Sequence, residues 1–78
     1  MSEITIREAR EEDAGAIARL AALDESEMPG GAALLAFVDG ELAVARSLRQ
    51  GDTVADPFRR TADVIDLLDL RAHQATAR

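Results

Sequence analysis

The chain contains no cysteine, lysine, asparagine, tryptophan or tyrosine, and these absences remove whole classes of site. Without cysteine there is no disulfide, no thiolate metal site and no cysteine nucleophile. Phe37 and Phe58 are the only aromatic residues, and the formal net charge is -6. A phosphate backbone is repelled by this charge, and no basic stripe interleaved with aromatic side chains is present to offset it. We therefore expect no nucleic-acid binding.

Long apolar runs are also missing. No stretch approaches the roughly 18 apolar residues that a membrane-spanning helix needs. Residues 1–8 lack the basic region and apolar core of a secretory signal, so we expect a cytoplasmic protein without membrane contact. The 78 residues make one small domain, residues 1–78. At this size only about 60% of the unfolded chain's surface is buried on folding, so the domain gains from a partner that adds to its core.

Residues 32–48 predict a β-hairpin, because two apolar runs flank the dipeptide Asp39-Gly40, which favours a type I′ turn. A two-residue loop pairs Val38 with Glu41 and, continued without interruption, Ala36 with Ala43. One sheet face then carries the bulky residues Leu35, Phe37, Leu42, Val44 and Leu48. The other face carries mostly small residues, namely Ala36, Ala43, Ala45 and Ser47 together with Leu34 and Val38. Neither face is polar, so both faces should be covered by helices.

The remaining elements follow from the period of their apolar residues. Residues 3–8 alternate as a half-buried strand at an edge of the sheet, and residues 11–23 have the helical period. Residues 24–31 form an acidic loop, Gln50-Gly51 forms a two-residue turn that places Val54 beside Ser47, and residues 53–55 form a last short strand. A second helix begins after Thr61 and runs to about residue 75.

These elements predict an α+β domain. Its sheet has four mainly antiparallel strands in the order β-α-β-β-β-α, with one helix on each face. The alanine-rich first helix suits the bulky sheet face, and the second helix, with Val64 and Leu68, suits the face of small residues.

Several short segments of the sequence are similar to segments of a known protein family. They are ITIREA at residues 4–9 with Asp13-Ala14 and Ile17, and AFVDGE at residues 36–41 with Val44-Ala45. In this order they resemble the N-terminal half of the GNAT acetyltransferase superfamily. The tail DPFR at residues 56–59, followed by Thr61, is similar to short stand-alone GNAT-like proteins of high-GC bacteria. The absence of lysine among nine basic residues is typical of the same source.

The resemblance implies a site for acetyl-CoA, and the sequence departs from the family at that site. In the family, a glycine-containing loop after the fourth strand donates backbone N–H groups to the pyrophosphate of acetyl-CoA. Here residues 57–62 read PFRRTA, which has no glycine, and Pro57 has no N–H to donate. Within residues 1–78 we expect no segment that corresponds to the family's fifth strand. We therefore expect a truncated GNAT-like half domain with no catalytic residue and no cofactor. The candidate anion site consists of Arg59, Arg60 and Thr61. It would bind acetyl-CoA only if the chain is half of an acetyltransferase, the alternative given below.

Other polar residues are interpreted as structural. Arg46 is predicted to lay its stem over Ala33 and Ala55 with its head in water. His73 lies near a helix C-terminus, where partial positive charge is favourable. Phe58 is predicted to pack into the core beside the start of the second helix. The acidic residues of that helix form a solvated face, and no metal site is expected: Asp63, Asp66 and Asp69.

The predicted interface combines the second helix with the last strand. Leu67 and Leu70 lie outside the apolar stripe of the helix, and the strand at residues 53–55 is a sheet edge without lysine. The expected interface residues are Thr53, Val54, Ala55, Leu67 and Leu70. They favour a non-catalytic domain that acts through protein contacts, as a homodimer or with another protein. The alternative is half of an acyl-CoA-dependent N-acetyltransferase, completed by a second chain. The acidic charge alone suggests a third hypothesis, a regulatory partner of a basic protein.

Overall fold

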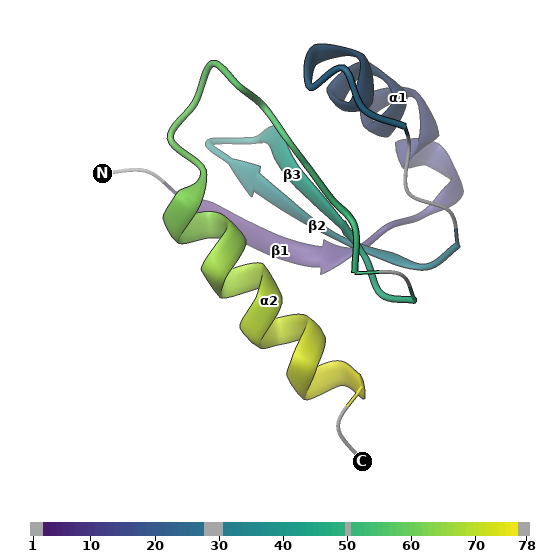
Figure 1. The fold of residues 1–78 in the computed structure, drawn as a ribbon, viewed down its shortest axis with the longest axis vertical. Helices are drawn as coiled ribbons and strands as arrows, with labels where there is room; N and C mark the ends of the chain where they lie inside the picture. Colours follow the sequence, from purple (N-terminus) through teal and green to yellow (C-terminus); the bar gives the residue numbers. More distant parts are fainter. Residues whose placement is uncertain (1–2, 28–30, 50, 77–78) are drawn as a thin grey trace.

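The computed structural model describes residues 3–27, 31–49 and 51–76 (Figure 1). Residues 28–30 of the expected acidic loop, and Gln50 of the expected second turn, lie outside the described residues. The elements follow the predicted order: β1 (Ile4–Glu8), a 3-10 turn η1 (Glu11–Asp13), α1 (Ala14–Leu23), β2 (Ala33–Val38), β3 (Glu41–Ser47), β4 (Thr53–Ala55) and α2 (Ala62–Thr76). The α+β layout is confirmed. Within the described part of the chain, no helix has the length and apolarity to cross a membrane.

The four strands form one sheet in the order β1-β2-β3-β4, and every neighbouring pair is antiparallel. β1 and β4 are therefore the two edges. α1 packs on β3 and β4, whereas α2 packs on β2 and β3. Because the two helices belong to separate core clusters, they cover opposite faces of the sheet, as predicted (Figure 1).

The β2–β3 hairpin turns at Asp39 and Gly40, both of which have positive φ (53° and 86°). This is the backbone that a type I′ turn requires, and Val38 pairs with Glu41 as predicted. The predicted pair of Phe37 with Leu42 also holds, but the register is wrong beyond it, because the ladder shifts there and Ala36 pairs with Val44 rather than Ala43. Ala43 is the extra residue of a β-bulge.

The bulge exchanges two core residues between the faces. Ala43 and Val44 both join the cluster under α2, and Ala45 moves to the cluster under α1. The predicted faces were therefore right on β2 and on β3 as far as Ala43, and wrong on β3 from Val44 on. The α2 side receives the bulkier valine, and the α1 side receives an alanine that lets the helix lie close.

The connection from β3 to β4 is longer than the predicted two-residue turn. The Ser47 N–H donates to the carbonyl of Asp52 (2.8 Å), and the Gly51 N–H donates to the carbonyl of Ser47 (3.1 Å). Val54 therefore pairs with Ala45 and not with Ser47, and its buried side chain lies in the α1 core.

Candidate functional site

Arg59, the first residue of the expected anion site, lies between two carboxylates. Its Nη2 donates a hydrogen bond to Oε2 of Glu41, and its Nε lies 3.4 Å from Oδ2 of Asp56. Asp56 also closes the turn before α2, since its Oδ1 accepts the N–H of Phe58 (2.9 Å). The guanidinium charge is thus already offset by the protein's own acids, and a bound anion would have to compete with them.

The other two residues of the expected anion site do not gather around Arg59. The carbonyl of Thr61 accepts the N–H of Ile65 (2.7 Å), which is the first backbone bond of α2. Arg60 is exposed, and none of the described ion pairs includes it. Of the two guanidinium groups, that of Arg59 is engaged and that of Arg60 is in none of the described ion pairs. Phe58 was predicted to pack into the core; it is instead exposed, because the Asp56 turn directs the chain outward before α2.

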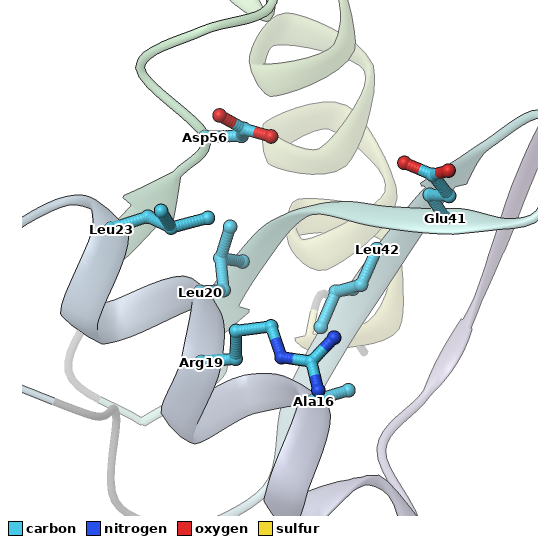
Figure 2. A pocket seen from close by; sticks show the side chains of 7 residues that line it. All are labelled: Ala16, Arg19, Leu20, Leu23, Glu41, Leu42 and Asp56. Atoms are coloured by element: carbon cyan, nitrogen blue, oxygen red, sulfur yellow. The ribbon is translucent and has the colours of Figure 1, made fainter.

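A pocket of about 360 Å³ lies beside this turn, between α1 and the edge of the sheet (Figure 2). Leu20 and Leu23 of α1 and Leu42 of β3 form its apolar floor. Glu41 and Asp56 lie at its rim, and Arg19 extends toward Leu42. Sequence reasoning missed this pocket because its residues come from three separate segments that only the folded chain brings together. Because Arg59 forms ion pairs with both acids at the rim, their negative charge is offset. The pocket surface is therefore part apolar and part polar, without a concentration of charge.

Among the described residues, Arg7 and Asp13 are the two whose pKa values depart clearly from their ordinary values. Nη1 of Arg7 donates to Oδ2 of Asp13 (2.7 Å), Nη2 donates to Oδ1 (2.8 Å), and the Arg10 N–H also donates to Oδ2 (2.7 Å). The hydrogen bond from Arg7, followed by that from Arg10, lowers the pKa of buried Asp13 from 3.8 to about 2. The bond to Asp13 in turn raises the pKa of Arg7. The guanidinium lies 4.8 Å from the centre of the Phe37 ring.

This pair joins β1 to the start of α1, so we interpret it as structural. Sequence reasoning placed Arg7 on the outer side of a strand and Asp13 in a first helical turn. It gave no reason to pair them. The available signal was their spacing across a strand-to-helix junction, where an acid at the third helical position accepts a backbone N–H from the residue that begins the turn.

Arg46 also has a partner that was not predicted. The bulge places it on the α2 side of the sheet between Leu34 and Thr53, where its Nε donates to Oδ1 of Asp69 (2.7 Å). The prediction of a solvated head over Ala33 and Ala55 was therefore wrong. The bulge puts Leu34 in place of Ala33, and the longer connection to β4 puts Thr53 in place of Ala55. His73 lies beside the same pair in an open surface depression. Among the described residues, no three His, Asp or Glu side chains come close enough to hold a metal ion.

The expected interface residues divide between two regions. On α2, Leu67 and Leu70 are 37% and 54% exposed, as their helical positions predicted. On β4, Thr53 and Ala55 are half-buried and Val54 belongs to the core. Leu67 lies about 160° around the helix from Asp69, at 100° per residue. Because Asp69 reaches toward β3, Leu67 lies on the opposite flank of α2, toward β1 and away from β4.

Comparisons with protein-family models, curated proteins and solved structures find no significant match for this chain. Its function is therefore inferred from the geometry above, together with the resemblance carried by the sequence words.

Proposed function

We propose that this chain is a non-catalytic, GNAT-like small domain that acts through protein–protein contacts, and that its first partner is a second copy of itself. The observation that carries the proposal is the pair of exposed leucines, Leu67 and Leu70, on the outer surface of α2. Two large aliphatic side chains one helical turn apart form a stripe that a partner can cover.

The size of the domain supports the same proposal. Full burial of a leucine is worth roughly 1.5 to 3 kcal/mol relative to full exposure, so covering two half-exposed leucines recovers part of this on each protomer. A domain of 78 residues has a small core to begin with, and association is a common way for such domains to gain stability.

The surroundings of Arg59 favour a non-catalytic role over the acetyltransferase alternative. A pyrophosphate at this position would have to displace Glu41 and Asp56 from the guanidinium. It would also find Pro57, which has no N–H, where the family offers backbone donors. Acetyl-CoA would therefore bind here only if a second chain supplied the missing backbone N–H donors.

The test is the molar mass of the protein by light scattering after size exclusion, for the parent chain and for a Leu67→Glu, Leu70→Glu variant. We expect a dimer for the parent and a monomer for the variant. Leu23→Glu is the matched control, because Leu23 is 41% exposed but lies on α1. It should keep the dimer. A monomeric parent, or a variant that remains a dimer with unchanged stability, would overturn the assignment of α2.

A further inference from the structure

The free edge of β1 carries backbone groups that point away from the sheet. The Glu3 carbonyl accepts the Asp39 N–H (2.8 Å), and the Ala9 N–H donates to the Ala33 carbonyl (2.9 Å), so both residues face β2. Backbone direction alternates along an antiparallel strand. The N–H and C=O groups of Ile4 and Ile6 therefore face outward, and no described element covers this side of β1.

The opposite edge of the sheet is less open. By the same alternation, Thr53 and Ala55 of β4 face outward, since the Asp52 carbonyl and the Asp56 N–H both bond to β3. The outward N–H of Ala55 already has an acceptor, because it lies 3.4 Å from Oδ2 of Asp24 at the end of α1. α1 also packs directly on β4. At this edge a partner strand would meet a strand of only three residues, and one of its outward N–H groups is already bonded.

Apolar side chains accompany the free edge of β1. Ile4 is 43% exposed, and its side chain shares the α2 face of the sheet with Ile6, which packs against the α2 core. Leu67 lies on the flank of α2 that is turned toward β1. One side of the molecule therefore combines open backbone groups with exposed isoleucine and leucine side chains.

The sequence of β1 is complementary to itself. We propose that β1 pairs antiparallel with β1 of a second copy about a two-fold axis at Thr5, joining the two sheets into one. In this register Ile4 pairs with the partner's Ile6, and each such pair exchanges both of its backbone hydrogen bonds. Glu3 lies opposite the partner's Arg7, whose guanidinium also binds Asp13 of its own chain, and Thr5 lies opposite the partner's Thr5. The inference rests on the proposed function, since it names the edge through which the two copies bind.

Charge and side-chain pairing select this register over its neighbours. Glu–Arg, Thr–Thr and Ile–Ile are favourable cross-strand pairs, whereas like charges directly opposite destabilise a pair of strands. A two-fold axis at Ile6 would place Ile4 opposite the partner's Glu8, and an axis at Arg7 would place two arginines opposite each other. Only the axis at Thr5 matches acid with base and isoleucine with isoleucine along residues 3–7.

Cysteine substitution tests the register directly, because the chain contains no cysteine of its own. The two Thr5 residues would form a non-hydrogen-bonded pair with Cα atoms about 4.5 Å apart, within disulfide range. The Cα atoms of the two Glu3 residues would be about 14 Å apart. Under mild oxidation of dilute protein, we expect Thr5→Cys to crosslink at least about tenfold faster than Glu3→Cys. Thr53→Cys on β4 should crosslink as slowly as Glu3→Cys.

Proline substitution tests the edge itself. Ile4→Pro removes an outward N–H and no bond of the internal ladder, and Thr53→Pro does the same at β4. We expect Ile4→Pro to give a folded monomer by light scattering and Thr53→Pro to remain a dimer. If the parent is a dimer, but Thr5→Cys crosslinks no faster than Glu3→Cys, the β1 contact is overturned while the proposed function stands. A monomeric parent overturns both.

Discussion

Arg7 and Asp13 are joined by two parallel hydrogen bonds, Nη1 to Oδ2 at 2.7 Å and Nη2 to Oδ1 at 2.8 Å. Paired donors matched to both oxygens of a carboxylate give strong and orientation-specific binding. The pair fixes Arg7 against the Phe37 ring on the α1 side of β1 and holds the end of the strand to the first helical turn. The ion pair thus adds a side-chain link between β1 and α1 to the ladder that joins β1 to β2.

This ion pair predicts a loss of stability in acid. Because Arg7 and Arg10 hold the pKa of Asp13 at about 2, below its ordinary value of 3.8, the native state keeps this carboxylate ionised where the unfolded chain protonates it. The contribution is fully present above about pH 4 and is lost as the pH falls toward 2. Urea unfolding at fixed protein concentration should show the midpoint falling across this range.

The Asp13→Asn variant isolates the effect. It should be less stable than the parent at pH 7, and the difference between the two proteins should shrink as the pH is lowered from 4 to 2. A difference that stays constant over that range would show that Asp13 does not carry the acid sensitivity.

The hairpin turn predicts a cost for Gly40→Val. Gly40 has a φ of 86°, a backbone conformation that a β-branched residue adopts only with strain. Nothing lies within 4 Å of the position that its Cβ would occupy, so the cost is that of the backbone alone. We expect a loss of about 1 to 3 kcal/mol in the free energy of unfolding, measured by chemical denaturation.

Gly15→Ala is the matched control for that substitution. Gly15 lies in α1 and also has open space around its Cβ position, but its backbone is helical. Alanine should stabilise the helix by about 0.5 to 1 kcal/mol. If both substitutions destabilise the protein equally, backbone conformation at Gly40 is not the cause.

The sequence could predict the elements and their layers because each depends on local rules. The turn at Asp39 and Gly40, the helical periods and the two apolar faces of the sheet all follow from residues close together in the chain. It could not predict the bulge at Ala43, since Ala43 and Ala45 are equally small and alternation fits either register as far as Leu42. The position of Arg46 on the α2 side follows from that one-residue shift, whereas the partner of Val54 follows from the longer connection between β3 and β4.

The candidate anion site predicts a negative result for acetyl-CoA. With Arg59 engaged by Glu41 and Asp56, isothermal titration at high micromolar concentration should give no saturable heat. A stoichiometric, saturable heat would instead favour the acetyltransferase half. In that case Arg59→Ala with Arg60→Ala should weaken binding several-fold, and Arg71→Ala, an exposed arginine on α2, should not.

The residues of the site were harder to predict than the fold, because their partners are distant in the chain. The sequence identified Arg59 correctly as a charged residue before a helix. Its partner Glu41 lies 18 residues earlier, across the hairpin, and no local pattern connects them. The exposure of Leu67 and Leu70 was predictable, since it depends only on the period of one helix.

The proposed association of two copies of this chain is measured by the mass of the parent protein in solution. Sedimentation equilibrium over a concentration series from about one to a hundred micromolar covers the range of ordinary domain association. We expect a mass of twice the 8.3 kDa chain at the upper concentrations, falling toward 8.3 kDa only on dilution. A mass of 8.3 kDa throughout the series would contradict it.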